Sequence, residues 1–288
     1  MKQYLSLIKF SHTIFALPFA LLGLFLGFFQ TGKFVPDWII LIKVLACMVF
    51  ARSAAMAFNR YVDRDIDRTN PRTAMREIPA GKIRPTQALF FVVLNVLLFI
   101  ATTYWINRIC FYLSPIALIV VLGYSYTKRF TFLCHLILGL GLSLAPIGAY
   151  LAVTGVFALV PVLYSLSVLC WVSGFDIIYA LQDERFDAEH KLKSIPVQFG
   201  AKTSLRISSA LHFICAILII YASFLTKGYL GQLFWLHWIG VFIFVGLLIY
   251  QHTLVKADKL DKVNLAFFTT NGIASILFGI FYISDLFI

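Results

Sequence analysis

Hydrophobic residues lie along this chain in long runs that are separated by short polar stretches. A run of about 20 apolar residues crosses a lipid bilayer as an α-helix, which satisfies its own backbone hydrogen bonds. The pattern predicts spans near residues 10–30, 38–60, 85–105, 110–127, 132–153, 158–180, 204–225, 233–254 and 265–287. We therefore expect an all-α fold, a polytopic membrane bundle of about nine transmembrane helices, and a single domain over residues 1–288.

The composition excludes the main alternatives to a membrane protein. Of the 288 residues, 61% are hydrophobic and 13% are charged, and the mean hydropathy is +0.89. Soluble domains average about 45–50% apolar and about 25% charged residues. An aromatic content of 16% also excludes a disordered chain. The five cysteines stand singly in apolar stretches, without the spacing of a zinc site or a disulfide framework.

The charges are distributed unevenly, and this predicts an orientation. The chain has 24 Lys and Arg against 13 Asp and Glu. Most of the basic residues fall before the first span and in the loops after the second, fourth, sixth and eighth spans. Cytoplasmic loops are enriched in Lys and Arg. We expect the N-terminus and these loops to be cytoplasmic and to face anionic lipid, in a cell (inner) membrane, with no nucleic-acid partner.

The acidic residues gather in two of these loops, and the first cluster follows the second span. It reads Asn59-Arg-Tyr-Val-Asp63-Arg-Asp-Ile-Asp67. Residues four apart project from one face of a helix, so Asn59, Asp63 and Asp67 are expected to form one column of oxygen ligands. Such a column suits a hard cation, and Mg²⁺ prefers a few carboxylates combined with water and phosphate oxygens.

The second acidic cluster follows the sixth span. Asp183 and Asp187 are again four apart, and Asp176 lies about two turns deeper on the same face. An ionisable residue at that depth is costly and is a functional candidate. Taken alone, each cluster is equally well explained as a solvated helix end. Two such clusters, both on the predicted cytoplasmic side, favour a metal site.

Basic residues crowd the same loops. Carboxylates that hold Mg²⁺ beside cations that bind phosphate form a recurring combination for diphosphates. Arg52 differs from the other arginines because it lies about two turns inside the second span, seven residues before Asn59. We expect Arg52 to face the bundle interior and to meet an anionic substrate group or Asp176.

Four ordered motifs resemble the intramembrane aromatic prenyltransferases. They are the Asn59–Asp67 column, Asn70-Pro-Arg-Thr-Ala-Met-Arg76-Glu-Ile-Pro-Ala-Gly81, Tyr124-Ser-Tyr-Thr-Lys-Arg129, and Tyr179-Ala-Leu-Gln-Asp183-Glu-Arg-Phe-Asp187 followed by Lys193-Ser-Ile-Pro. Within that family the chain is most similar to the 4-hydroxybenzoate polyprenyltransferases of ubiquinone biosynthesis and their menaquinone-pathway relatives. The resemblance extends from the first span to the ninth.

The resemblance implies a bundle of nine helices around a central cavity with cytoplasmic cap loops, and it implies roles for individual residues. Two Mg²⁺ ions would be held by Asn59, Asp63, Asp67, Asp183 and Asp187. The diphosphate of a polyprenyl diphosphate would be bound by Arg72, Arg76, Lys128, Arg129 and Lys193. The four aspartates and Tyr124 are the candidate catalytic residues, and Arg52 and Asp176 are the candidates for binding the acceptor.

The expected reaction is Mg²⁺-dependent transfer of a polyprenyl group to an aromatic acid in quinone biosynthesis. Stabilising the departing diphosphate is the main electrostatic task, and aromatic faces such as those of Tyr124, Tyr126 and Tyr179 would shield the allylic cation. One departure concerns the acceptor, because many family members have Asp directly after the leading Asn, where this chain has Arg60. The acceptor therefore stays open between 4-hydroxybenzoate, a naphthoate and a futalosine-route intermediate.

Two other classes of membrane protein fit the sequence less well. An ion or solute transporter would carry its acids near the bilayer midplane, in two related halves with discontinuous helices. Here most of the acids lie at helix ends on one side, without an obvious inverted repeat. A CDP-alcohol phosphotransferase would carry a D-x-x-D-G-x-x-A-R run, which the sequence from Asp63 onward does not match.

Overall fold

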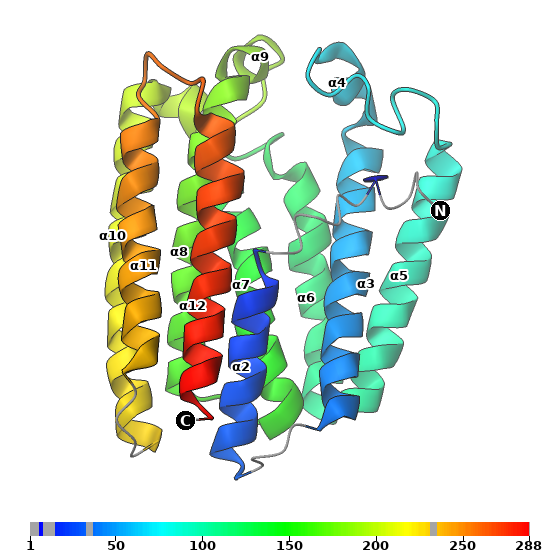
Figure 1. Cartoon of the computed structure of the whole chain (residues 1–288). Helices are drawn as coiled ribbons and strands as arrows, with labels where there is room; N and C mark the ends of the chain where they lie inside the picture. The colour runs from blue at the N-terminus through cyan, green and yellow to red at the C-terminus, as the bar shows by residue number, and fades with distance from the viewer. Residues whose placement is uncertain (1–5, 8–14, 33–36, 231–234, 288) are drawn as a thin grey trace. The chain divides into compact units, whose positions relative to one another are not determined.

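The structure is a computed structural model that describes residues 6–7, 15–32, 37–230 and 235–287. The helices divide into two compact units, which are described separately (Figure 1). The first unit comprises residues 1–13 and 37–126, and the second comprises residues 14–36 and 127–288. Within the described ranges the regular structure is helical, which confirms the all-α prediction.

The first unit is built on two long helices, α3 (Trp38–Val62) and α5 (Pro85–Ile106), which pack against each other. Asp37 caps α3, because its Oδ1 accepts hydrogen bonds from the backbone N–H groups of Ile39 and Ile40, at 2.9 and 3.2 Å. The short helix α4 (Arg64–Thr69) follows α3, and α6 (Arg108–Thr127) follows α5. Near the start of α3 and the end of α5, Lys43 Nζ donates to the Trp105 carbonyl at 2.6 Å.

A small hydrophobic core ties the loop after α4 to the long helices of the first unit. Its buried members are Leu7, Ala54, Ala57, Ile78, Ile83, Ala88 and Val92. Ile78 and Ile83 come from the loop. The alanines at 54 and 57 come from α3, and Ala88 and Val92 come from α5. The motif-bearing loop is therefore anchored on the helices and does not extend freely into water.

The second unit is organised around α8 (Leu159–Ala180), most of whose side chains are buried. It packs against α7 (Cys134–Thr154) on one side and α10 (Ile195–Leu230) on another. A one-turn 3₁₀ segment (Leu181–Asp183) and the short helix α9 (Glu184–Glu189) follow α8. The remaining helices are α2 (Leu17–Gln30), α11 (Leu236–Leu254), a π-helical turn (Leu265–Thr270) and α12 (Asn271–Asp285).

Small residues allow the helices of the second unit to approach closely. A Cβ atom on Gly139 of α7 would lie 2.3 Å from Ser173 Oγ and 2.5 Å from the Leu169 carbonyl oxygen of α8. A Cβ atom on Gly23 of α2 would lie 2.1 Å from the Pro146 carbonyl oxygen. Helices in a bilayer associate through such close contacts, because lipid offers no hydrophobic driving force between them.

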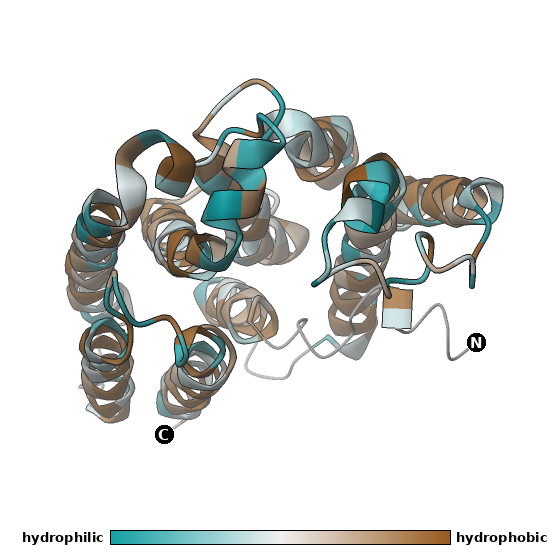
Figure 2. Ribbon diagram, turned by 90° about the horizontal axis from the view of Figure 1, so that it is seen from above, coloured by the Kyte–Doolittle hydropathy of each residue, from teal (hydrophilic) through white to brown (hydrophobic). Residues whose placement is uncertain are grey.

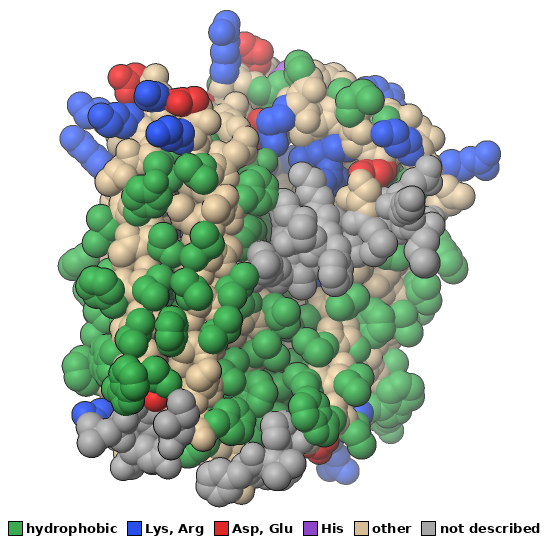
Figure 3. Space-filling view, in the orientation of Figure 1, with side chains coloured by type: hydrophobic (Ala, Val, Ile, Leu, Met, Phe, Trp, Pro, Cys, Tyr) green, Lys and Arg blue, Asp and Glu red, His purple; other side chains and the backbone are tan. Residues whose placement is uncertain are grey.

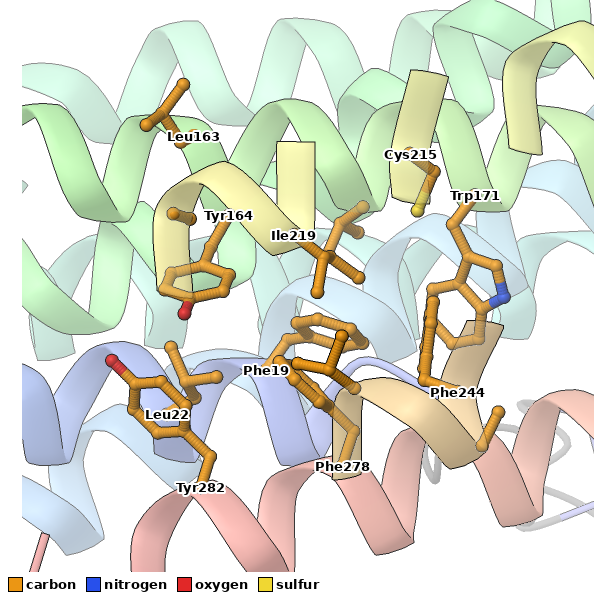
Figure 4. Packing of buried hydrophobic residues seen from close by; sticks show 14 of the residues in the cluster. Phe19, Leu22, Leu163, Tyr164, Trp171, Cys215, Ile219, Phe244, Phe278 and Tyr282 are labelled. Atoms are coloured by element: carbon orange, nitrogen blue, oxygen red, sulfur yellow. The ribbon is translucent and has the colours of Figure 1, made fainter. Parts of the chain in front are cut away.

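Aromatic side chains fill the core of the second unit (Figure 4). Phe19 lies 5.3 Å from Trp171 and 5.5 Å from Phe278, measured between ring centroids, and Trp171 lies 5.4 Å from Phe244. A buried hydrogen bond crosses the same core, in which Trp171 Nε1 donates to Asn271 Oδ1 at 2.8 Å. These contacts hold α2, α8, α11 and α12 together.

Eight described helices are long and apolar enough to cross a membrane. They match the second to ninth predicted spans, and α2 covers the described part of the first, whose residues 10–14 lie outside the described ranges. Hydrophobic side chains cover the middle of the helices, while Lys, Arg, Asp and Glu gather towards their ends (Figure 3). Exposed rings such as Phe90, Tyr112 and Phe242 are 70–81% exposed. The chain is a multi-pass membrane protein, and its status as one domain stays a prediction.

Candidate active site

The first acidic cluster begins in the last turn of α3. Asn59 Nδ2 donates to Asp63 Oδ2 at 3.0 Å, as expected for polar residues spaced four apart on one helix face. The helix ends at Val62, and Asp63 is the capping residue whose N–H bonds to the Asn59 carbonyl at 2.9 Å. The expected single helical column is therefore interrupted at Asp63, and Asp67 belongs to α4.

The interruption has a local cause. The carbonyl groups in the last turn of a helix lack intrahelical partners. Arg64 Nη1 donates to the Tyr61 carbonyl at 2.7 Å, and its guanidinium lies over the Tyr61 ring, 4.8 Å from the centroid. The chain can thus leave α3 and begin α4 without an unpaired carbonyl at Tyr61. The Asp67 N–H still bonds to the Asp63 carbonyl at 2.7 Å, so the chain path stays close to helical.

Asp67 is buried and is held by Arg76 from the loop after α4. Arg76 Nη1 donates to both carboxylate oxygens, at 2.6 Å to Oδ1 and 2.8 Å to Oδ2. The Thr73 hydroxyl donates to the Asp67 carbonyl at 3.0 Å, and Asn70 Oδ1 accepts from the Arg72 N–H at 2.9 Å. The loop therefore folds back on α4 and carries Arg72 and Arg76 to the acidic helix.

The second acidic cluster has a similar pairing of a buried carboxylate and a cation. Asp183 ends the 3₁₀ segment, Asp187 lies in α9, and both are buried. Lys128 Nζ donates to Asp187 Oδ2 at 2.9 Å. Burial alone would lower the pKa of Lys128, but the ion pair with Asp187 and the nearby Cys134 and Asp183 raise it above its usual value.

Two further predicted residues lie in the segments around Lys128. The Lys193 N–H donates to the Lys128 carbonyl at 2.7 Å, and Lys193 Nζ donates to the Phe130 carbonyl at 3.2 Å. Arg129 is exposed next to Lys128. The structure thus brings Lys128, Lys193 and Asp187 together in the second unit.

Asp176 has a partner that sequence reasoning missed. His135 Nδ1 lies 2.6 Å from Asp176 Oδ2, so α7 and α8 share an imidazole–carboxylate pair in which His135 is buried and Asp176 is partly buried. His135 Nε2 is buried without a hydrogen-bond partner among the described residues. No local pattern signals the pair, because its members are 41 positions apart and no histidine spacing marks His135.

Arg52, Tyr124 and Tyr126 lie in the first unit, and Tyr179 lies in α8 of the second. Arg52 is partly buried in α3, and its Nε has no hydrogen-bond partner in the described part of the chain. Tyr124 is partly buried near the end of α6, and Tyr126 is more exposed, with its ring 5.8 Å from Phe58. The expected contact between Arg52 and Asp176 would join two units that are described separately, so it stays a prediction.

Many hydrophilic residues lie in the short helices and loops at the ends of the long, mostly hydrophobic helices (Figure 2). In each unit one carboxylate, Asp67 or Asp187, is buried and balanced by a basic side chain from another segment. A buried carboxylate is costly without such a partner. Each arrangement can therefore offer carboxylate oxygens and a cation close together.

The oxygen donors fit Mg²⁺. No three His, Cys, Asp or Glu side chains come together to hold a metal ion within the ranges that the structure describes. Mg²⁺ seldom uses such an all-protein cage, since it keeps water and binds through one or two carboxylates plus substrate phosphate. In the first unit the side-chain oxygens of Asn59, Asp63 and Asp67 supply such a smaller set, and in the second unit those of Asp183 and Asp187 do so.

Fold and site together define a helical multi-pass membrane protein with acidic and basic clusters at helix ends. The model of the UbiA prenyltransferase family matches residues 16–273, and the chain belongs to this family. It is therefore a membrane prenyltransferase, as the sequence motifs predict.

Individual relatives agree with this assignment. The chain is 31% identical to a 4-hydroxybenzoate octaprenyltransferase from Tolumonas auensis over 245 residues, which are 85% of this chain and 84% of the relative. It is 31% identical to the enzyme of the same name from Aliivibrio fischeri over 252 residues, 87% and 85% of the two chains.

Solved structures share the fold. The apo structure of a UbiA homolog from Aeropyrum pernix K1 is similar with a TM-score of 0.82 and 31% identity, covering 95% of this chain and 98% of the other. A UbiA homolog from Archaeoglobus fulgidus, solved with GPP and Mg²⁺, is similar in fold with a TM-score of 0.74 and 22% identity, covering 99% and 100%.

Proposed function

We propose that this chain transfers a polyprenyl group from an allylic polyprenyl diphosphate to an aromatic acceptor, 4-hydroxybenzoate or a related acid, in quinone biosynthesis. The names of the relatives from Tolumonas auensis and Aliivibrio fischeri support this acceptor class. The observation that carries the proposal is that each unit pairs a buried carboxylate with a cation at a helix end, through Asp67 with Arg76 and Asp187 with Lys128. Such pairs suit a magnesium diphosphate, which brings both positive and negative charge.

Magnesium would be held by oxygen ligands from both acidic clusters. These are Asn59, Asp63 and Asp67 of the first unit and Asp183 and Asp187 of the second, for two ions in all. The solved homolog from Archaeoglobus fulgidus holds Mg²⁺ with GPP, which supports the use of this metal. When bound, Mg²⁺ supplies positive charge that stabilises the leaving phosphate oxygens.

The basic residues would bind the diphosphate and stabilise it as it departs. Arg76 is already oriented by Asp67, and Lys128 by Asp187, so each cation is fixed before substrate binds. Arg72, Arg129 and Lys193 would add further donors to the phosphate oxygens. Preorganised cations of this kind lower a barrier because they need no rearrangement when charge develops.

The reaction breaks the bond between the allylic carbon and the diphosphate oxygen, and both electrons leave with the diphosphate. A ring carbon ortho to the phenol hydroxyl then forms a bond to the allylic carbon. The ring proton passes to a carboxylate or to the released diphosphate, which restores aromaticity. The Tyr124 ring would shield the allylic cation by a cation–π contact, and a dry, apolar surrounding would exclude water.

Arg52 and Asp176 would position the acceptor. The unpaired Nε of Arg52 suits the carboxylate of an aromatic acid. Asp176, oriented by His135, would accept a hydrogen bond from the phenol hydroxyl. Among the possible acceptors we favour 4-hydroxybenzoate because of the relatives' names, and a naphthoate or a futalosine-route acid is the alternative.

We place the enzyme in the cell (inner) membrane with its acidic and basic loops on the cytoplasmic side. The excess of Lys and Arg in these loops supports this orientation. The polyprenyl tail would lie in the bilayer, which accounts for an apolar enzyme that binds a highly charged headgroup.

A panel of acceptors tests the proposal. Purified protein is given a polyprenyl diphosphate, Mg²⁺ and one acceptor at a time, and the lipid product is identified by mass spectrometry. We expect prenylated 4-hydroxybenzoate to be the main product. Prenylation of a naphthoate or a futalosine-route acid alone would assign the chain to another branch. The absence of any prenylated aromatic product would contradict the proposed function.

A further inference from the structure

Arg60 is a buried cation that the roles assigned so far do not include. It lies in the last turn of α3 and is 2% exposed. Its Nε and Nη1 have no hydrogen-bond partner in the part of the chain that the structure describes. A buried guanidinium with unsatisfied donors is unfavourable, so the position of these donors requires an explanation.

Nearby acids do not supply the missing acceptors. The charge of Arg60 interacts with those of Asp67 and Glu77, and also with those of Arg72 and Arg76. Both carboxylate oxygens of Asp67 already accept from Arg76. Glu77 Oε1 accepts from the Ser6 hydroxyl at 2.5 Å, and Glu77 Oε2 is buried without a hydrogen-bond partner among the described residues. The two negative and two positive charges that act on Arg60 therefore do not neutralise its own positive charge.

A purely structural role at the end of α3 is already filled by another residue. A cation near a helix C-terminus is stabilised by the helix dipole and by bonding to the last carbonyl groups. Arg64 provides that contact, because its Nη1 donates to the Tyr61 carbonyl. Nε and Nη1 of Arg60 bond to no carbonyl of the described chain.

We propose that Arg60 binds an oxyanion of a substrate, through the fork formed by its guanidinium N–H groups. The chemistry is that of a phosphate or carboxylate group, which accepts two parallel hydrogen bonds from a guanidinium. This inference rests on the proposed function and adds a binding residue to it. The diphosphate of the prenyl donor and the carboxylate of the aromatic acid are the two possible sources of the oxyanion.

The experiment compares Arg60→Gln and Arg60→Lys with wild-type protein, and Arg68→Gln serves as the matched control. Arg68 is an exposed arginine on α4, so its substitution removes the same charge from the same region. KM is measured separately for the polyprenyl diphosphate and for the aromatic acceptor. We expect Arg60→Gln to raise one of these KM values at least tenfold, Arg60→Lys to raise it less, and Arg68→Gln to leave both within twofold.

The substrate whose KM rises identifies the source of the oxyanion. An increase for the prenyl donor assigns Arg60 to the diphosphate, and an increase for the acceptor assigns it to the carboxylate. If both KM values for Arg60→Gln stay within twofold of wild type, the proposal is wrong. A fall in kcat alone, with both KM values unchanged, also contradicts it.

A binding measurement covers the case in which Arg60→Gln does not fold or the wild type shows no transfer. Thermal unfolding of detergent-purified wild type and Arg60→Lys is followed with inorganic pyrophosphate and, separately, with 4-hydroxybenzoate. We expect one of these anions to stabilise the wild type and to stabilise Arg60→Lys less. Equal stabilisation of both proteins, or none, overturns the role of Arg60. Failure of transfer with every acceptor counts against the proposed function alone.

Discussion

Arg76 holds both carboxylate oxygens of Asp67 with a single nitrogen, at 2.6 and 2.8 Å, although the two residues lie on different segments of the first unit. The contact orients a cation and a carboxylate together, before any substrate is present. In the proposed function, the Asp67 carboxylate would hold a metal ion and the Arg76 guanidinium would bind a phosphate group.

Substitution of Arg76 tests this role. Arg76→Lys keeps the charge but loses the planar fork, so we expect KM for the polyprenyl diphosphate to rise about tenfold, equivalent to about 1.4 kcal/mol. KM for the aromatic acceptor should change little. Steady-state kinetics with each substrate varied in turn measures both values. Arg68→Lys, at an exposed position of α4, should behave like the wild type. An unchanged KM for the diphosphate in Arg76→Lys would remove Arg76 from the binding site.

The ion pair between Lys128 and Asp187 should contribute to stability. Lys128→Met leaves the buried Asp187 without its cation, and we expect a loss of about 1–3 kcal/mol, because Lys128 is itself partly exposed. Since the pKa of Lys128 is raised, this contribution is fully present below the unfolded value of about 10.4 and is lost only as the pH rises through the higher folded value.

Thermal unfolding in detergent, with a chelator to remove metal ions, measures the effect from pH 7 to 10. The difference in stability between the wild type and Lys128→Met should stay constant over this range. A difference that disappears by pH 9 would contradict the raised pKa, and no difference at any pH would show that the pair does not stabilise the fold.

The pair of His135 and Asp176 should act on the acceptor and not on the prenyl donor. Asp176→Asn and His135→Asn are each expected to raise KM for the aromatic acid about tenfold, while KM for the diphosphate stays near that of the wild type. Because the two side chains contact each other, the double variant should be no worse than the more damaging single variant. If the KM effects of the two single variants add in the double variant, the pair does not function as one unit. Equal increases in KM for both substrates would show that the pair does not act on the acceptor alone.

The close approach of α7 and α8 predicts a selective effect on stability. Gly139→Ala would place its Cβ 2.5 Å from the backbone oxygen of Leu169, which cannot move easily, and we expect a loss of about 1–3 kcal/mol. Gly148→Ala is the matched control on the same helix, because no atom lies within 4 Å of its Cβ. Thermal unfolding should therefore show a lower Tm for Gly139→Ala alone. Equal Tm values for the two variants would contradict the observed helix packing.

The parts of the structure that depend on local pattern could be predicted from the sequence. Apolar runs identified the long helices, because a bilayer demands helices of that length. The spacing of Asn59 and Asp63 predicted that they share a helix face, and their contact in the structure agrees with this. The break between α3 and α4 at Asp63, within the expected column, was not predicted, because it depends on how Arg64 reaches the Tyr61 carbonyl.

Contacts between distant segments could not be predicted in the same way. Lys128 and Asp187 were both assigned to the site, but their ion pair joins residues 59 positions apart and depends on how the loop before α7 packs near α9. The contact of His135 with Asp176 depends on the register between α7 and α8, which the closely packed Gly139 helps to set. For this reason His135 had no role in the sequence interpretation.

The measurement that tests the central claim most directly is transfer of a labelled polyprenyl group to 4-hydroxybenzoate, with Mg²⁺ and with a chelator. We predict that the chelator abolishes product and that added Mg²⁺ restores it. Asp63→Ala and Asp183→Ala should each reduce turnover at least a thousandfold (about 4 kcal/mol), whereas Asp65→Ala, at a side chain that is 71% exposed, should retain wild-type activity. Product formed equally well with the chelator, or near-normal turnover in Asp63→Ala or Asp183→Ala, would contradict the account.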